Sequence, residues 1–331
     1  MPRSVTSVFS ELEDFETALR KEGCLGLLTT GRGQFRARLT QITLHRLRLA
    51  GGDEQLSRIA FVAVPHDMVL ISFPIGAASS LIWDGIGVRA GEIMIIGPGR
   101  RVHARTDGPC RWGAIWLPAE ELIRYGRALT GAPFSVPPVA RCWRPPPAAG
   151  RYLRQLHAAA IRVAKTQPQA LVDAEAAHGL EQQLIGILVE CLTGLVDKRV
   201  PAIGQCQNIL GRFEDLLQAE PARNLRMAEI CSALAVSDRQ LRILCAGHLG
   251  IKPIAYIRLR RMSLVRRALG QCEGNGGANV TEIARRHGFH NGGSFAASYR
   301  NLFGELPSAT LARGLRGGMA DLARRCRPVP M

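Results

Sequence analysis

The sequence predicts an α+β protein, in which a β-rich N-terminal sandwich or barrel with attached helices precedes an all-α C-terminal domain. Two observations predict it. Short apolar runs separated by Gly, Pro and Asp fill residues 35–118, and the apolar period becomes helical from residue 151 onward. A length of 331 residues, 47% of them hydrophobic, is enough for two or three domains with their own cores. We expect four segments: 1–145, 146–205, 206–316 and 317–331, the last a flexible basic tail.

Five apolar runs between residues 58 and 118 carry most of the strand prediction. They read RIAFVAVP, DMVLISFPI, SSLIWDGIGV, GEIMIIGP and RWGAIWLP, and turn residues separate them at intervals typical of a sandwich or barrel. A helix is predicted over residues 118–131, with Pro118 near its first turn and Gly131 at its end. The run Pro145, Pro146 and Pro147 then predicts a domain boundary or a stiff linker.

Residues 151–195 form a helical region with one apolar stripe. Such a stripe serves either as core packing inside the first domain or as the seam of a dimer, and the sequence leaves both open. Its members are Leu180, Leu184, Ile187, Leu188, Cys191 and Leu195.

Positive charge is concentrated in the C-terminal part of the chain. The formal net charge is +16, and residues 221–316 carry 15 Lys and Arg against 5 Asp and Glu, whereas residues 1–220 carry 25 against 21. Genome composition can explain the preference for Arg over Lys, but not this regional bias. The bias is typical of a polyanion-binding module attached to a nearly balanced domain.

Several classes of protein are disfavoured. No apolar run reaches about 18 residues, so no membrane span is expected, and the charged N-terminus lacks the apolar region of a secretory signal. We therefore expect a cytoplasmic protein. The 9 cysteines form no C-x-x-C pair and are interpreted as reduced. There is no P-loop, no G-x-S-x-G and no H-x-H, and the isolated His45, His66 and His103 predict no metal or cofactor.

Two segments of the C-terminal part resemble each other. MAEICSALAVSDRQL and VTEIARRHGFHNGGSF each contain an acidic residue, an isoleucine, a turn, a polar cap and the start of a second helix. Ser237 and Asn291 are placed to cap those second helices, and Gly288 fits a turn that needs positive φ. We therefore predict two helix-turn-helix units. The expected packing residues are Ile230, Leu234, Val236, Leu241 and Leu244 in the first copy, and Ile283, Ala284, Phe289 and Phe295 in the second.

A single helix is predicted to join the two units, over KPIAYIRLRRMSLVRRALG. Pro253 suits its first position and Gly270 its end. Such a spacer would hold both second helices on one side of the domain, which suits successive major grooves about 34 Å apart. Its expected buried stripe is Ile254, Ile257, Met262, Val265 and Leu269.

Residues from about 224 to 311 closely resemble the DNA-binding domain of AraC/XylS-type transcription regulators. The residues that carry the resemblance are AVSDRQL, LGIKPIAYIRLRRMSLVRRAL, VTEIARRHGF and FAASYRNLFGELP. The resemblance implies cytoplasmic DNA binding, control of transcription and activation through contact with RNA polymerase. It also implies a cupin-like sensor and a dimerising helix before the DNA-binding domain, although the N-terminal part resembles the family only weakly, through GEIMIIGPGRRVHARTDGPCRWGAIWLP.

The sequence departs from the family pattern on the exposed faces. Ile243 stands where the family commonly has an arginine, and Arg242 precedes it. The other departures are Ala235 in the first turn, Ala296 and Ala297 in the second reading helix, and Thr310 and Leu311 after Pro307.

Candidate DNA contacts are therefore chosen by the hydrogen bonds that each side chain can make with bases or phosphates. Arginine can read guanine and glutamine can read adenine, so direct base reading is expected mainly from Arg239, Gln240 and Arg242. The second helix is expected to contribute docking and shape. Arginines 258, 260 and 261 are either phosphate contacts or solubility charges. The full candidate set is Ser237, Arg239, Gln240, Arg242, His290, Asn291, Ser294, Ser298 and Arg300.

The sequence thus predicts a sequence-specific transcriptional regulator, an effector-responsive activator that binds double-stranded promoter DNA as a homodimer and contacts RNA polymerase. Its small-molecule effector would lie among Trp83, His103, Arg105, Trp112 and Trp116. The alternative is a cupin-type enzyme with an appended basic domain, which would need about three converging His or carboxylate ligands for a metal.

Overall fold

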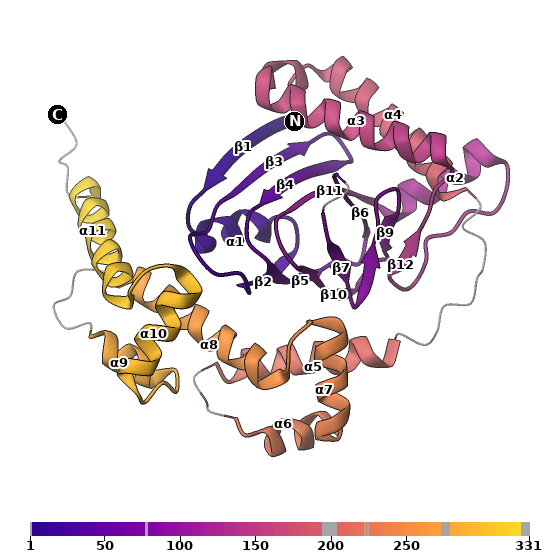
Figure 1. Ribbon diagram of the computed structural model, residues 1–331. Coiled ribbons are helices and arrows are strands. Elements are labelled where there is room, and N and C mark those ends of the chain that lie inside the picture. The colour runs from indigo at the N-terminus through magenta and orange to yellow at the C-terminus, as the bar shows by residue number, and fades with distance from the viewer. Residues whose placement is uncertain are drawn as a thin grey trace. The chain divides into compact units, whose positions relative to one another are not determined.

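The structure is a computed structural model that describes residues 2–76, 79–193, 204–221, 223, 225–272 and 279–325 (Figure 1). The chain divides into two compact units, and the main boundary along the chain falls between Asn208 and Ile209. No helix in the described part is both long enough and apolar enough to cross a membrane.

The N-terminal unit contains two β-sheets. The seven-stranded sheet is antiparallel throughout, in the order β1 (Arg3–Phe9), β3 (Ala37–Thr43), β4 (Arg48–Glu54), β11 (Cys110–Pro118), β6 (Met68–Pro74), β9 (Ile93–Ile96) and β12 (Arg141–Trp143). The five-stranded sheet has the order β2 (Cys24–Thr29), β5 (Arg58–Ala63), β10 (Arg101–Thr106), β7 (Leu81–Trp83) and β8 (Ile86–Val88). The five predicted apolar runs form β5, β6, β7 with β8, β9 and β11, so the β-rich N-terminal fold is confirmed.

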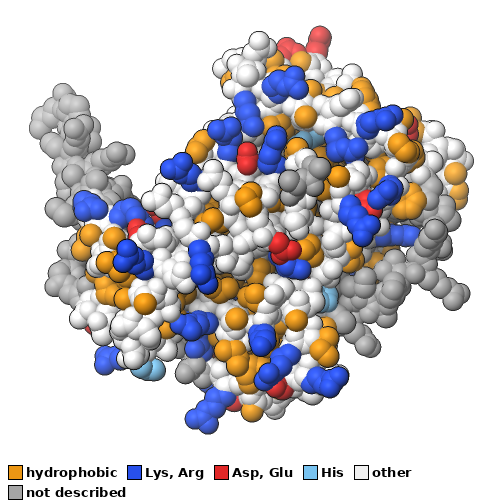
Figure 2. Space-filling model, in the orientation of Figure 1, with side chains coloured by type: hydrophobic (Ala, Val, Ile, Leu, Met, Phe, Trp, Pro, Cys, Tyr) orange, Lys and Arg blue, Asp and Glu red, His pale blue; other side chains and the backbone are white. Residues whose placement is uncertain are grey.

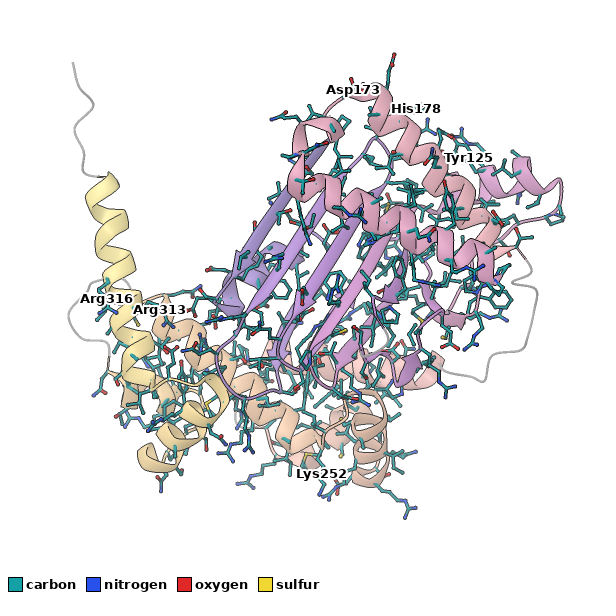
Figure 3. The ribbon with its side chains drawn as sticks, turned by 45° about the horizontal axis from the view of Figure 1, so that its top comes forward. Tyr125, Asp173, His178, Lys252, Arg313 and Arg316 are labelled. Carbon is teal, nitrogen blue, oxygen red and sulfur yellow. The ribbon has the colours of Figure 1, made fainter. Side chains whose placement is uncertain are left out.

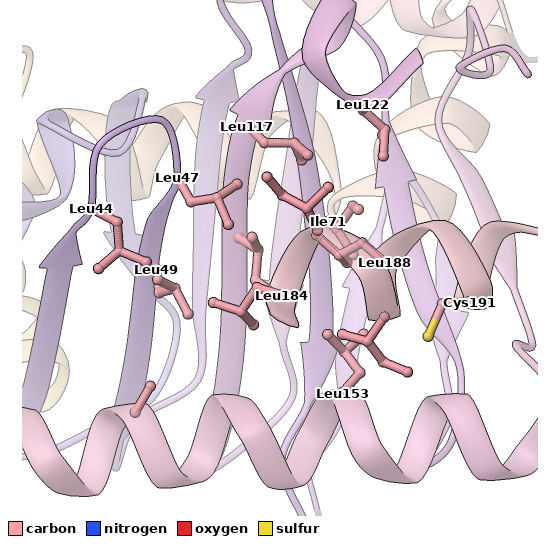
Figure 4. Packing of buried hydrophobic residues seen from close by; sticks show 14 of the residues in the cluster. Leu44, Leu47, Leu49, Ile71, Leu117, Leu122, Leu153, Leu184, Leu188 and Cys191 are labelled. Carbon is pink, nitrogen blue, oxygen red and sulfur yellow. The ribbon is translucent and has the colours of Figure 1, made fainter. Parts of the chain in front are cut away.

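Alternation along the strands creates two separate cores. In β6, for example, Leu70 belongs to the cluster between the sheets and Ile71 to the cluster on the outer face of the large sheet. Three helices cover that outer face, α2 (Ala119–Thr130), α3 (Pro147–Thr166) and α4 (Ala174–Leu192), while α1 (Leu12–Arg20) packs into the inner cluster (Figures 1 and 4). The short 3₁₀ turn η1 (Pro168–Leu171) links α3 to α4.

The apolar stripe of α4 belongs to the core of the N-terminal unit. Leu184, Ile187, Leu188 and Cys191 are all buried among strand residues of the outer face (Figure 4). Glu181 of the same helix accepts the backbone N–H groups of residues 46 and 47, at 2.8 and 3.3 Å, and so fixes α4 to the turn between β3 and β4. These contacts favour core packing over a dimer seam; the last stripe residue, at position 195, lies outside the described residues.

The proline run lies inside the N-terminal unit. Pro147 begins α3, where its missing N–H costs nothing, and β12 just before it pairs with β9. Trp143 of β12 donates its Nε1–H to the carbonyl of Cys191, at 2.8 Å.

At the start of α4, Asp173 accepts the N–H of Ala176 and caps the helix (Figure 3).

From Ile209 onward, the regular elements that the structure describes in the C-terminal unit are all helices, which confirms the predicted fold class. Helices α6 and α7 form the first helix-turn-helix, α9 and α10 form the second, and α8 joins them (Figure 1). Helix α11 extends to Arg325, and residues 326–331 of the expected basic tail lie outside the described residues. The helices are α5 (Gly204–Ala219), α6 (Met227–Leu234), α7 (Asp238–His248), α8 (Pro253–Gly270), α9 (Val280–Arg286), α10 (Gly292–Phe303) and α11 (Pro307–Arg325).

The joining helix buries most of its predicted stripe. Ile257, Met262, Val265 and Leu269 are buried, but Ile254 is 60% exposed, so that part of the prediction is wrong. The first turn instead buries Pro253 and Tyr256, and the Tyr256 hydroxyl donates to the buried carboxylate of Glu214 in α5.

Candidate nucleic-acid interface and buried cavity

The first helix-turn-helix begins its second helix with a reciprocal cap. Ser237 Oγ accepts the N–H of Gln240 at 3.1 Å, and Gln240 Oε1 accepts the backbone N–H of Ser237 at 2.9 Å. Ala235 precedes them in the left-handed conformation, with φ of 53°, and makes the turn from α6. The polar groups of Ser237 and Gln240 are therefore used to cap the N-terminus of α7.

Beyond this cap, the exposed face of α7 carries two arginines and one isoleucine. Arg242 is paired with Asp238 one turn earlier, at 2.8 Å. Among the described residues, the Arg239 side chain has no hydrogen-bond or ion-pair partner, and Ile243 is 60% exposed. Arg239 and Ile243 are four positions apart, so they lie on one face and border the same shallow hollow.

The second helix-turn-helix uses some of its candidate residues for its own structure. Asn291 Oδ1 accepts the N–H of Ser294 at 3.0 Å and caps α10, while Ser294 Oγ donates to the Asn291 carbonyl at 3.3 Å. Ser298 Oγ accepts Arg258 Nη2 of α8 at 2.7 Å. His290 and Arg300 are exposed. Gly288 has the predicted positive φ, 82°, at the turn from α9.

An aromatic row and an ionic cluster support α10. The rings of Phe289, Phe295, Tyr299 and Phe303 are successive neighbours, 4.7–5.7 Å apart. The Tyr299 hydroxyl is 2.8 Å from Thr310 Oγ1, which in turn donates to Glu305. Arg313 (Figure 3) and Arg266 pair with Glu305 at 2.7 and 3.2 Å. Thr310, one of the departures from the family pattern, therefore places a buried hydroxyl in a network whose hydrogen bonds are satisfied.

The joining-helix arginines also make contacts within the C-terminal unit. Arg260 donates to Glu214 at 2.6 Å and Arg261 to the carbonyl of Arg223 at 3.3 Å, in addition to the Arg258 contact with α10. Arg260 is largely buried, with 19% of its side chain exposed, so its role is structural. Over the visible face of the molecule, Lys and Arg still outnumber Asp and Glu (Figure 2).

The N-terminal unit contains a second candidate site, a buried cavity between its two sheets. It encloses an empty volume of ≈ 470 Å³, part of which is open to solvent. Trp83, Trp112 and Trp116 line it, as the sequence prediction proposed for an effector pocket. The other lining residues are Leu19, Glu22, Cys24, Arg58, Ala60, Val62, Leu70, Ser72, Leu81, Ala104 and Ala114.

The two remaining effector candidates do not line this cavity. Ala104 is the residue of β10 that faces it, so His103 and Arg105 point to the opposite face of the strand. His103 stacks on Phe61, with ring centroids 4.8 Å apart, and Arg105 pairs with Asp107.

Two charged residues of the cavity, Arg58 and Glu22, were not among the predicted effector contacts. Arg58 donates to Glu54 through Nε at 2.9 Å and Nη2 at 3.1 Å, and Trp112 Nε1 also donates to Glu54. Burial is the largest influence on Arg58 and opposes its charge, but the charge and hydrogen bonds of Glu54, with smaller contributions from Cys110 and Cys24, together keep the Arg58 pKa above its usual value. Glu22, the other missed residue, accepts Gln41 Nε2 at 2.9 Å, and burial raises its pKa.

Three polar atoms of the lining residues are buried without a hydrogen-bond partner among the described residues. They are the indole Nε1 of Trp83, the indole Nε1 of Trp116 and Oε2 of Glu22. Within the same described residues, no three His, Cys, Asp or Glu side chains are grouped as a metal site requires. The cavity thus offers unsatisfied hydrogen-bonding groups in an apolar wall rather than a cluster of metal ligands.

Comparison with known sequences places the similarity in the C-terminal unit. The family described as "Helix-turn-helix domain" matches residues 230–313. The XylDLEGF operon transcriptional activator 1 of Pseudomonas putida is 36% identical over 102 residues, which make up 31% of this chain and 30% of the relative. A probable thc operon regulatory protein of Rhodococcus erythropolis is 34% identical over 97 residues, 29% of each chain. This chain thus matches about a third of the length of these relatives.

Solved structures with similarity to this chain include two proteins described as AraC-like or AraC family. The AraC-like transcriptional activator CuxR aligns over 79% of this chain and 94% of its own, with 14% identity and a TM-score of 0.43. A probable AraC family transcriptional regulator from Rhodopseudomonas palustris aligns over 33% of this chain and 98% of its own, with 29% identity and a TM-score of 0.30.

Proposed function

We propose that this chain is a cytoplasmic, effector-responsive transcriptional activator of the AraC/XylS family, because its C-terminal helices match the helix-turn-helix family model and the XylDLEGF operon activators. The observation that carries the proposal is a pair of complete helix-turn-helix units on one rigid spacer, α8. Two second helices held in this way suit two successive major grooves, one helical turn apart. Contact with RNA polymerase and homodimer formation are further parts of the proposal.

Within the first helix-turn-helix, we assign direct base reading to Arg239 and Ile243 of α7. The Arg239 guanidinium has no partner among the described residues and can donate two hydrogen bonds to guanine, while Ile243 on the same face can contact a thymine methyl group. Gln240 is held in the cap and Arg242 is held by Asp238, so both must first exchange a partner before they read a base.

Within the second helix-turn-helix, we assign to α10 the role of docking the domain onto the DNA backbone. Asn291 and Ser294 form its cap, which leaves backbone N–H groups of the first turn and the exposed Arg300 for phosphate oxygens. His290 is the remaining exposed candidate for base contact. The small residues Ala296 and Ala297 let the helix approach the groove closely and offer methyl contacts.

The N-terminal unit would hold the effector in its buried cavity. The three tryptophans, the apolar wall and the unsatisfied polar atoms support this role. Effector binding between the sheets would change the affinity of the protein for DNA. This change is what would make the activator effector-responsive.

The DNA-binding part is tested by gel shift of the full chain with the DNA upstream of its own and neighbouring genes. We expect a sequence-selective shift that weakens steeply with salt, because phosphate contacts release counterions. Binding that is equal on all sequences, or absent with and without cell extract, contradicts the proposal.

Arg239→Ala should weaken binding to a selected site by about 1–3 kcal/mol and relax the preference at one base pair. Arg242→Ala should cost less at neutral pH, because its ion pair with Asp238 competes with DNA. Arg285→Ala, on the exposed side of α9, is the matched control for lost positive charge and should leave base preference unchanged. A larger change of preference for Arg242→Ala than for Arg239→Ala would contradict this assignment.

A further inference from the structure

The chemistry of the cavity in the N-terminal unit narrows the kind of molecule that it can bind. This inference rests on the proposed effector role of that cavity. Its lining residues carry three polar atoms with no partner among the described residues: two indole N–H donors and one carboxylate oxygen, Glu22 Oε2. Trp83 and Trp116 are 6% and 2% exposed, so solvent cannot readily satisfy their donors. A buried polar group without a partner is destabilising, and a ligand that supplies the partner gains that free energy.

The lining offers no free positive charge. Arg58 donates through Nε and Nη2 to Glu54 and through Nη1 to the carbonyl of Ala104, at 3.1 Å. Its charge is therefore compensated within the protein. Glu22 accepts Gln41 Nε2, and the cations that act on it, Arg48 and Lys21, are not among the residues that line the cavity. A ligand carboxylate would therefore meet a second carboxylate in a largely apolar space.

The remaining wall suits a compact apolar body. The lining combines three small side chains, Ala60, Ala104 and Ala114, with the indole rings of Trp83, Trp112 and Trp116. Indole faces pack well against another ring through apolar contact.

We propose that the cavity binds a small, uncharged, hydroxyl-bearing molecule with a ring-sized apolar body. The hydroxyl oxygen accepts an indole N–H of Trp83 or Trp116, and the hydroxyl hydrogen is donated to Glu22 Oε2. One hydroxyl group thus satisfies both kinds of unpaired group, which a carboxylate cannot do.

Three probes with the same ring test this: cyclohexanol, cyclohexanecarboxylate and cyclohexylamine. Binding to the full chain without DNA is followed by calorimetry at pH 8, because a high pH favours the ionised form of Glu22, whose pKa burial raises. We expect cyclohexanol to bind at least tenfold more tightly than the carboxylate. Equal or tighter binding of the carboxylate, tighter binding of the amine than of the alcohol, or no binding of the alcohol overturns the proposal.

Variants separate the hydrogen bonds from ring packing. Trp83→Phe and Trp116→Phe keep an aromatic ring but remove the N–H, and at least one should weaken cyclohexanol binding threefold to tenfold. Trp143→Phe is the control, because Trp143 lies outside the cavity. Glu22→Gln should raise the affinity for the carboxylate about tenfold relative to the alcohol. An unchanged ratio in Glu22→Gln contradicts the role of that carboxylate. Gel shift without any probe tests DNA binding separately, so the two proposals can fail independently.

Discussion

Glu54→Gln should destabilise the N-terminal unit by about 3–5 kcal/mol, because it leaves the Arg58 guanidinium charged in a buried site. The Arg58 side chain is 6% exposed and that of Glu54 is fully buried. Arginine cannot lose its proton in a protein, so the unpaired charge persists at any working pH. Urea unfolding followed by tryptophan fluorescence measures the effect. All four tryptophans, at positions 83, 112, 116 and 143, lie in this unit.

Arg58→Met is the matched variant, and it should cost less than Glu54→Gln. Removal of the arginine leaves no permanent cation in the buried site, and the Glu54 carboxyl group still accepts Trp112 Nε1. The methionine side chain also fills most of the vacated space. Equal losses in the two variants, or a loss below about 1 kcal/mol for Glu54→Gln, would show that the pair is hydrated rather than buried.

Acidification should destabilise the N-terminal unit through His157. This histidine is fully buried in α3, its Nε2 is 3.0 Å from the carbonyl oxygen of Ala50, and its ring lies edge-on to Phe73. Burial lowers its pKa from 6.5 to about 4. Below pH 6.5, the unfolded chain therefore binds a proton at this histidine, whereas the folded chain does not. Stability is full above pH 6.5 and falls by about 3 kcal/mol as the pH drops to 4.

The measurement is urea unfolding of the full chain at several pH values between 7 and 4. His157→Gln lowers stability at pH 7, but it should remove this part of the pH dependence. His178→Gln is the control, because His178 of α4 is exposed (Figure 3) and should keep the wild-type slope. The same slope in wild type and His157→Gln would assign the acid sensitivity to other groups.

Much of the fold could be predicted from local pattern. Turn residues bounded the five apolar runs, and Pro253, Gly288 and Asn291 marked helix starts and a turn because their backbone requirements are local. Strands β1, β2 and β12 were missed, since pairing with β3, β5 and β9 stabilises them more than their own composition does. Ile254 was misjudged because the tyrosine two residues later fills the buried position through a contact with α5.

The candidate sites were only partly predictable. In β10, the apolar alternation of Val102 and Ala104 indicated the inward face, and it would have excluded His103 and Arg105. The pairing of Asp238 with Arg242 was likewise readable from their four-residue spacing. By contrast, Glu54, Arg58 and Glu22 become neighbours of the tryptophans only through sheet packing, for which the sequence holds no local signal.

The central claim is that two helices of one chain read two successive major grooves. Selection of bound sequences from a random duplex pool, with the full chain, tests it most directly. We expect enrichment of two conserved blocks whose centres are about 10 base pairs apart, one of them weakened by Arg239→Ala. A single conserved block, or no enrichment above the starting pool, would contradict the account.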